Sequence, residues 1–264
     1  MLIICNGIFK SGSTWLHAIV LEMLQTRSVK LENVSEIYTN NINSPTAIVE
    51  SRLQKFLNQE DFIGNNYITK SHYLKINTFR KFYPNEIKFL FINRDPKDAI
   101  VSHYYHIRNK YSIKISFSFY YYMLGRYKGY EIAMFNNLYQ KYFPEKNFVS
   151  YSELKTNFSS VIQKLCIILD LKEFNHKEIE KVKKNTSIDS LREKIRNQDT
   201  KYYSTVTKNK WKLIRKGDIG DWKQYFSDRQ IRDFKKVELL EVSLFTRGIY
   251  FFLFTLRRVL FNIE

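Results

Sequence analysis

The residues best suited to chemistry lie in one short loop near the start of the chain. They are Gly7, Lys10, Ser11, Gly12, Ser13 and Thr14. A lysine ammonium and hydroxyl groups can all donate hydrogen bonds to an anion. The backbone N–H groups of a glycine-containing loop that opens a helix do the same, because they point together at the helix N-terminus. This combination predicts a phosphate-binding loop.

The segments on either side of the loop must position it. Residues 2–5 are apolar and predict a buried strand. After Trp15, apolar residues recur at helical spacing and predict a helix. They are Leu16, Ile19, Val20, Met23 and Leu24. The order of strand, loop and helix favours anion binding, and the alternative is an ordinary strand–turn–helix in which Lys10 has no ligand.

The loop differs from the Walker A loop of ATP- and GTP-binding proteins, which runs G-x-x-x-x-G-K-[ST]. Gly7, Gly12 and Thr14 keep that spacing, but Ser13 occupies the position of the lysine. The lysine that must reach the β- and γ-phosphates is therefore absent from its place. This disfavours an ordinary ATP or GTP site.

A candidate general base follows the next predicted strand. Residues 67–72 read as a short strand that ends in His72. Histidine titrates near neutrality and can accept a proton at physiological pH. The alternative is a histidine with only a polar structural role.

A second candidate for phosphate binding follows the strongly apolar segment 88–93, which predicts another strand. Asp95 and Pro96 are typical of a helix start, so Arg94 would end the strand and Ser102 would lie about two turns into the helix. An arginine fork and a hydroxyl could bind one phosphate together. The alternative is an Arg–Asp pair that only holds the turn.

The rest of the chain is expected to complete one α/β domain over residues 1–264. The expected elements are loops and short helices over 27–66 with helical spacing over 48–57, a helix over 120–139 with a loop near Gly125–Gly129, a strand over 147–151, a helix over 161–169, and a helical tail over 231–264. Aromatic residues are concentrated over 104–143. Most of them are expected in the core, and some in an acceptor pocket.

The composition favours a folded protein with an anionic partner. Of 264 residues, 43 are basic and 26 acidic, and the formal net charge is +17. Such a charge suits a nucleotide, an acidic acceptor, a membrane surface or nucleic acid. Cys5 and Cys166 form neither a disulfide framework nor a zinc pattern. The strand at residue 2 leaves no room for a signal peptide, and no apolar run reaches the about 18 residues of a membrane helix, so a cytoplasmic location is expected.

Six segments resemble motifs of the sulfotransferases that use 3′-phosphoadenosine 5′-phosphosulfate (PAPS). They are Lys10-Ser11-Gly12-Ser13-Thr14-Trp15, Lys70-Ser71-His72, Arg94-x-x-x-Asp98-x-x-x-Ser102, Tyr151-Ser152-Glu153-Leu154-Lys155, Thr186-Ser187-Ile188 and Arg215-Lys216-Gly217-x-x-Gly220-Asp221-Trp222. They occur in the family's order, and the resemblance covers essentially the whole chain. The last string is the most specific of them.

The resemblance implies a central parallel sheet flanked by helices, with a P-loop-like phosphosulfate loop. It also implies in-line transfer of a sulfuryl group to an acceptor hydroxyl or amine, with release of 3′,5′-ADP and without a metal. His72 would be the base, and Lys10 and Lys70 would neutralise the leaving 5′-phosphate. The residues that the resemblance assigns to PAPS are Lys10, Ser11, Gly12, Ser13, Thr14, Trp15, Arg94, Ser102, Tyr151, Thr186, Ser187, Arg215, Lys216 and Gly217.

Some residues differ from the family's motifs, and several properties of the protein have more than one possible interpretation. Phe9 replaces a proline, Ser13 replaces a threonine, and the dimerisation pattern is not kept. The acceptor could be a small molecule, a glycan or a lipid. The segment 244–261 could be a core helix, a dimer contact or a peripheral membrane contact. The alternative functions are a P-loop nucleotide kinase and a non-enzymatic basic protein that binds membrane or nucleic acid, although no nucleic-acid module is present.

Overall fold

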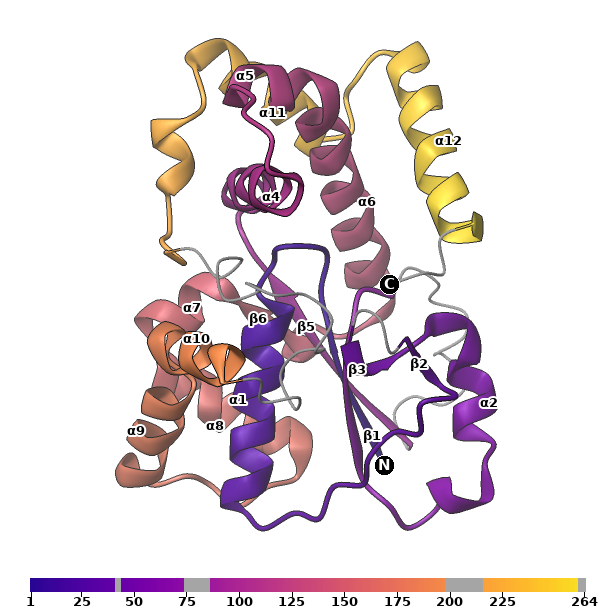
Figure 1. Ribbon diagram of the computed structural model, residues 1–264, viewed down its shortest axis with the longest axis vertical. Helices are drawn as coiled ribbons and strands as arrows, with labels where there is room; N and C mark the ends of the chain where they lie inside the picture. Colours follow the sequence, from indigo (N-terminus) through magenta and orange to yellow (C-terminus); the bar gives the residue numbers. More distant parts are fainter. Residues whose placement is uncertain (41–43, 74–85, 198–215, 261–264) are drawn as a thin grey trace.

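The computed structural model describes residues 1–40, 44–73, 86–197 and 216–260 (Figure 1). At its centre lies a four-stranded sheet in the order β4-β1-β5-β6, and all three pairings are parallel. The strands are β1 (Leu2–Asn6), β4 (Tyr67–Ser71), β5 (Ile87–Asn93) and β6 (Phe148–Ser150). The central parallel sheet flanked by helices is therefore confirmed.

Side chains alternate along the strands and so build two apolar cores. Ile3 of β1 and Leu90 of β5 belong to the core that includes α1 (Ser13–Thr26) and α8 (Phe158–Leu169). Ile4 and Phe89 belong to the other core, which includes side chains of α6 (Arg126–Tyr142). Because both faces are covered, the strands read as continuous apolar runs in the sequence.

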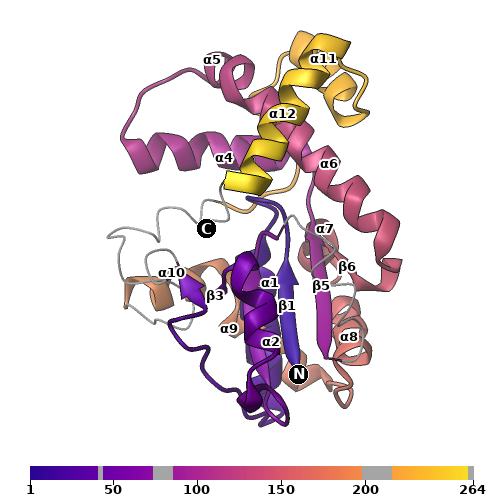
Figure 2. The same ribbon diagram turned by 90° about the vertical axis from the view of Figure 1, so that its right-hand side faces the viewer.

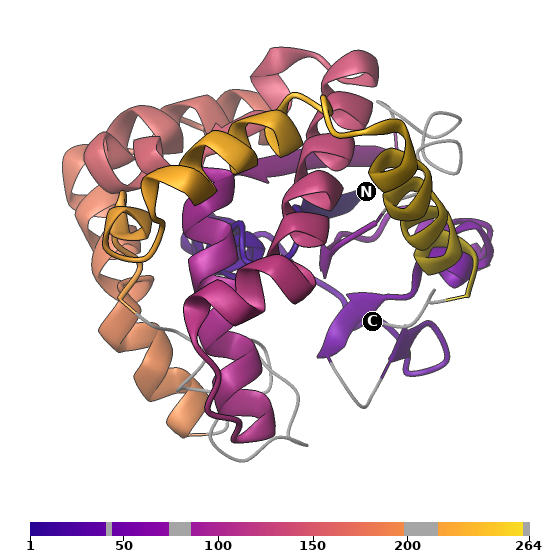
Figure 3. The ribbon, with the colours of Figure 1, turned by 90° about the horizontal axis from the view of Figure 1, so that it is seen from above.

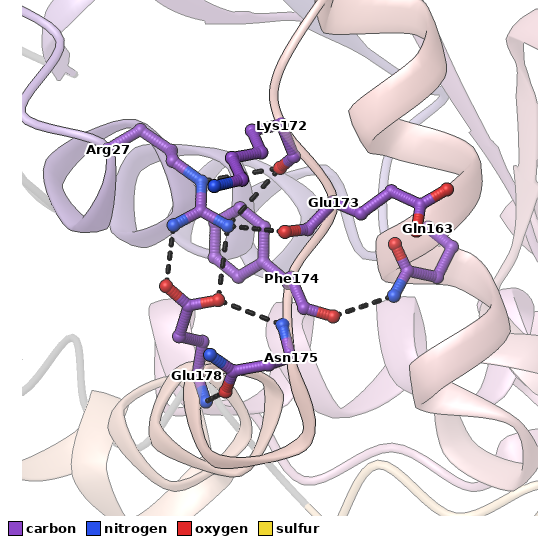
Figure 4. Close-up of polar contacts among 7 residues, drawn as sticks. All are labelled: Arg27, Gln163, Lys172, Glu173, Phe174, Asn175 and Glu178. Carbon is purple, nitrogen blue, oxygen red and sulfur yellow. Dashed lines mark hydrogen bonds and ion pairs between the residues drawn. The ribbon is translucent and has the colours of Figure 1, made fainter.

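Helices α7 (Tyr151–Thr156), α9 (His176–Asn185) and α10 (Ile188–Arg196) join α1 and α8 on one side of the sheet (Figure 1). Arg27, at the end of α1, connects the helices on this side of the sheet (Figure 4). Its guanidinium pairs with Glu178 of α9 at 2.5 Å and donates to the carbonyls of Lys172 and Glu173. It also lies 4.0 Å from the centre of the Phe174 ring. Arg27 thus has a structural role in joining α1 to α9.

A second group of helices lies beyond the carboxyl ends of the strands (Figures 1 and 3). It consists of α4 (Pro96–Tyr111), α5 (Phe117–Tyr120), a π-helical turn (Tyr121–Gly125), α6, α11 (Asp228–Glu238) and α12 (Leu244–Leu260). Ligands of open parallel sheets bind at this edge. The residues after β1, β4 and β5 therefore meet between the sheet and these helices.

The segment between α1 and β4 contains a small antiparallel strand pair that the sequence analysis did not predict. Its strands are β2 (Thr39–Asn40) and β3 (Ser44–Ile48). Short helices follow at Glu50–Arg52, at α2 (Leu53–Leu57) and at Glu60–Phe62. Further 3-10 turns lie at Glu145–Asn147 and Asp221–Gln224. Ile48 is in a strand, so the helical segment begins later than its spacing indicates.

Two predictions about helices were wrong. No loop interrupts the chain near Gly125–Gly129, because Gly129 lies inside α6, where a Cβ would be 2.4 Å from the ring of Phe234. The tail is not one helix, since α11 ends at Glu238 and α12 begins at Leu244. Leu240 has a left-handed φ of 58°, and Ser243 caps the N–H of Thr246 at 3.2 Å.

Candidate active site

The loop between β1 and α1 has the backbone geometry of an anion site. Gly12 precedes α1 with a φ of 106°, and its carbonyl accepts the N–H groups of Trp15 and Leu16 at 2.8 and 3.0 Å. A Cβ at Gly12 would lie 2.7 Å from the ring of Tyr151, so only glycine fits there. Among the residues that the structure describes, no side chain caps the start of α1, and the first turn of this helix has no acidic residue. The positive end of this helix is therefore left for a ligand.

The loop is also surrounded by cations. Burial, together with the charges of Arg94 and Lys70, lowers the pKa of Lys10 to about 8. Lys70 comes from β4, and its ammonium lies 3.4 Å from the hydroxyl of Thr14. In the described parts of the chain, no carboxylate forms an ion pair with Lys10 or Arg94. Lys10, Lys70 and Arg94 thus bring three positive charges to one loop, and the charges of Lys70 and Arg94 contribute to the lowered pKa of Lys10. Such a cluster of cations indicates a site for a polyanion.

Two buried donors support the fit of a phosphate-bearing ligand. The hydroxyl of Ser11 and the Nε of Arg94 are buried without a hydrogen-bond partner among the described residues. Buried polar groups usually have partners, and donors without one mark a place where a ligand can supply the acceptor. These residues therefore fit the phosphates of PAPS.

Arg94 lies where three segments meet. Its guanidinium donates to the carbonyl of Lys10 at 3.4 Å and to that of Asp218 at 3.1 Å, and it lies 4.4 Å from the centre of the Tyr151 ring. The alternative Arg–Asp pair is not formed. Asp95 instead caps α4 by accepting the N–H of Lys97 at 2.8 Å, as predicted.

Asp98 has a role that the sequence analysis missed. Its side chain is buried and accepts the N–H groups of Gly220 at 2.8 Å and Trp222 at 3.1 Å. It thereby fixes the segment that follows Lys216 and Gly217 to the start of α4. Its place between Arg94 and Ser102 in the quoted motif was the signal that could have identified it.

Tyr151 connects the loop to the same segment. Its hydroxyl donates to the carbonyl of Gly217 at 3.1 Å. Gly217 has a φ of 69°, and a Cβ there would lie 2.7 Å from that hydroxyl oxygen. Lys216 is exposed, and Ser102 on α4 is partly exposed. Arg215 lies outside the described residues.

The structure also brings together the residues that the resemblance assigns to the adenine. The indole N–H of Trp15 donates to the carbonyl of Thr186 at 3.0 Å, and the Trp15 ring meets the Tyr151 ring edge-on at 5.2 Å. The hydroxyl of Thr186 donates to the carbonyl of Val182, and that of Ser187 accepts the N–H of Ser190. These two hydroxyls therefore hold the ends of α9 and α10, while Trp15 and Tyr151 present aromatic surface.

His72 is held directly against the phosphate loop. Its Nδ1 is hydrogen-bonded to the carbonyl of Gly7. A carbonyl only accepts, so Nδ1 carries the hydrogen and the neutral ring has its lone pair on Nε2. The side-chain oxygen of Asn6 accepts from Ser71 at 3.1 Å and from the N–H of Tyr73 at 2.9 Å. These bonds fix the chain on both sides of His72.

A second histidine, His17 on α1, is buried. Its burial, together with the charge of Lys70, lowers its pKa to about 3. It therefore stays neutral over the physiological pH range. Titration of His17 cannot produce a change of activity near neutral pH.

Other features of the described residues limit the function. No cluster of His, Cys, Asp or Glu suited to a metal occurs among them. None of the helices in the described ranges is long and apolar enough to cross a membrane. Cys5 and Cys166 are buried free thiols, as predicted.

The first strand of the parallel sheet, the loop after it and helix α1 form an anion site that is lined by cations. These features are those of an α/β protein that binds a phosphorylated ligand. The sulfotransferase domain family matches residues 2–241, and the chain belongs to this family. It is therefore an enzyme of the sulfotransferase class.

Known proteins resemble the chain in sequence and in fold. Human sulfotransferase 2A1 is 31% identical over 175 residues, which cover 63% of this chain and 61% of that protein. The guinea-pig (Cavia porcellus) 3-beta-hydroxysteroid sulfotransferase is 27% identical over 241 residues, which cover 86% of this chain and 79% of that protein. The solved structure of mouse sulfotransferase SULT7A1 complexed with PAP has a TM-score of 0.63 at 18% identity and covers 94% of this chain and 87% of its own. The last comparison supports the fold.

Proposed function

We propose that this protein transfers the sulfuryl group of PAPS to a hydroxyl or amine of a small molecule, with His72 as the general base. The observation that carries the proposal is the bond between His72 Nδ1 and the carbonyl of Gly7. Gly7 opens the loop that carries Lys10, so the base and the cation of the phosphate site are fixed relative to each other. Such fixed geometry is what an in-line transfer requires.

In this mechanism, Nε2 of His72 takes the proton of the acceptor as the acceptor oxygen bonds to sulfur. The bond from sulfur to the 5′-phosphate oxygen breaks, and 3′,5′-ADP leaves. Lys10 and Lys70 stabilise the negative charge that develops on the leaving phosphate. Because the charges are supplied by side chains held in place, the step needs little reorganisation.

We assign the rest of the co-substrate to the remaining residues of the site. Arg94 and Ser102 would bind the 3′-phosphate, together with Arg215, Lys216 and Gly217. Ser11, Gly12, Ser13 and Thr14 would bind the 5′-phosphosulfate. Trp15, Tyr151, Thr186 and Ser187 would surround the adenine. Support comes from the aromatic contact of Trp15 with Tyr151 and from the carbonyl contacts that place Arg94 beside Lys10.

The acceptor is the least defined part of the reaction. We propose a small hydroxylated molecule, because a relative with 27% identity is a 3-beta-hydroxysteroid sulfotransferase by name. We also propose that residues 1–264 form a single sulfotransferase domain that works in the cytoplasm, as expected for a chain that resembles the cytosolic enzymes.

The test is transfer of labelled sulfate from PAPS to a panel of sterols, phenols, sugars and amines. We expect one 3′,5′-ADP for each sulfated product, and no phosphorylated product when ATP replaces PAPS. Transfer to none of the acceptors, with 3′,5′-ADP still bound, would contradict the proposed acceptor class. Phosphoryl transfer from ATP would instead favour a kinase.

A further inference from the structure

Helix α12 has two apolar sides, and among the described residues only one of them contacts the rest of the protein. Tyr250 packs against Tyr127 and Tyr130 of α6, with ring centroids 5.7 and 5.4 Å apart. Phe254 is 2% exposed and belongs to the core on that side of the sheet. The inner side of α12 is therefore a docked helix face.

The outer side of α12 is apolar and exposed to solvent. Phe245, Ile249 and Phe252 are 79%, 42% and 63% exposed. Their spacings of four and three residues place them along one side of a helix, opposite Phe254. Leu244, Phe251 and Leu253 widen this exposed surface. Figures 1 and 2 show α12 on the outside of the molecule, alongside α6. We call Phe245, Ile249, Phe252 and Leu253 the outer face.

The net charge of the chain favours one kind of partner for the outer face. The sequence of α12 has three arginines, Arg247, Arg257 and Arg258, and no acidic residue. The whole chain carries a net charge of +17. A second copy of this chain would carry the same net charge of +17, and the two copies would repel each other. An anionic lipid surface attracts such a helix and accepts its aromatic side chains.

We propose that α12 is a membrane-surface helix whose outer face inserts into the headgroup region of an anionic bilayer. The helix would lie in the plane of the membrane, with its inner face still docked on α6. Phenylalanine and isoleucine side chains supply the burial of apolar area, and the basic residues supply attraction to acidic lipids. The proposal concerns where the protein is held, and it does not depend on the proposed acceptor or on His72.

The test is sedimentation of the full chain with vesicles of phosphatidylcholine, with and without phosphatidylserine. The Ile249→Ser and Phe252→Ser double variant removes apolar surface from the outer face. Ile63→Ser with Ile167→Ser is the matched control, because these isoleucines are 86% and 75% exposed on other parts of the protein. All substituted side chains are exposed, so each variant should fold and keep its thermal stabilisation by 3′,5′-ADP.

We expect the wild type and the control to sediment with vesicles that contain phosphatidylserine and to be released by about 0.5 M salt, where charges are screened beyond a few ångströms. The outer-face variant should lose roughly tenfold or more in vesicle partitioning, since two apolar anchors are gone. Equal binding of both variants, or no vesicle binding by the wild type, would overturn the proposal. A concentration-dependent dimer in sedimentation velocity that the outer-face variant abolishes would also overturn it, and would assign the face to a second copy.

Discussion

The carboxylate of Asp98 accepts the backbone N–H of Gly220 at 2.8 Å across more than a hundred residues of sequence. A second bond, from the N–H of Trp222 at 3.1 Å, strengthens the same connection. Asp98 follows Arg94 at the start of α4, and Gly220 follows Lys216 and Gly217. The two segments assigned to the 3′-phosphate are therefore joined to each other before any ligand is present.

The first prediction is that Asp98→Ala weakens binding of 3′,5′-ADP. The variant leaves two N–H groups without their charged acceptor, and bonds to charged groups contribute about 1.5–3 kcal/mol. Calorimetric titration should show a loss of about ten- to a hundredfold in affinity. Asp95→Ala is the control, since Asp95 caps only its own helix, and it should cost about 1 kcal/mol of stability with unchanged affinity. Equal affinities of the two variants would refute a role of Asp98 in the site.

The second prediction concerns Lys10, whose folded-state pKa of about 8 lies below the ordinary value of 10.5. Below pH 8 the protonated side chain destabilises the free protein, and this penalty disappears as the pH rises from 8 toward 10.5. Lys10→Met should therefore stabilise the ligand-free protein at pH 7 by on the order of 1 kcal/mol after screening by solvent. It should also remove the thermal stabilisation by 3′,5′-ADP.

Melting curves at pH 7 and pH 10, with and without 3′,5′-ADP, check this prediction. The difference between the ligand-free Lys10→Met variant and wild type should shrink at the higher pH. A variant that melts below the wild type at pH 7, yet still responds fully to the ligand, would mean that Lys10 is a structural residue.

The third prediction compares two arginines that both contact backbone carbonyls. Arg94→Ala should lower the affinity for 3′,5′-ADP by about tenfold or more, because one cation of the phosphate site is lost. Arg27→Ala should lower the melting temperature, since it breaks the pair with Glu178, and should leave the affinity unchanged. If Arg94→Ala instead behaves like Arg27→Ala, Arg94 only joins the loop to the segment at Asp218.

The fourth prediction separates chemistry from binding. His72→Ala should lower turnover by about 10²–10⁴-fold, the usual effect of removing a positioned general base. Affinity for 3′,5′-ADP should barely change, because other residues hold the nucleotide. The wild-type rate should fall as acid converts imidazole into imidazolium, and His17 cannot cause this fall because its pKa is about 3. A folded His72→Ala enzyme with near wild-type turnover would exclude His72 as the base.

The strands and the phosphate loop could be predicted from the sequence because their signals are local. The predicted strands at 2–5 and 88–93 are short apolar runs that end in polar residues, and Asp95 with Pro96 marks the start of α4. Asp98 was missed because its partners lie 122 and 124 residues away, and no local pattern reveals such a contact.

In the helical regions, glycine and serine did not show by themselves whether a helix continues or ends. Gly129 looks like a loop residue, but it gives Phe234 of α11 room to approach α6. Ser243 caps the start of α12 and so marks the interruption between α11 and α12, although the apolar pattern on either side of it looks continuous. Tertiary packing decides whether a helix continues through such a residue, and the local sequence pattern does not reveal that packing.

The most direct test of the central claim is calorimetric titration of the wild-type protein with 3′,5′-ADP and with adenosine 5′-monophosphate. The account predicts that 3′,5′-ADP binds about ten- to a hundredfold more tightly, because only this ligand has the 3′-phosphate assigned to Arg94, Ser102 and the segment joined to Asp98. Equal affinities, or no detectable binding of 3′,5′-ADP, would contradict the assignment of this cation-lined loop to PAPS.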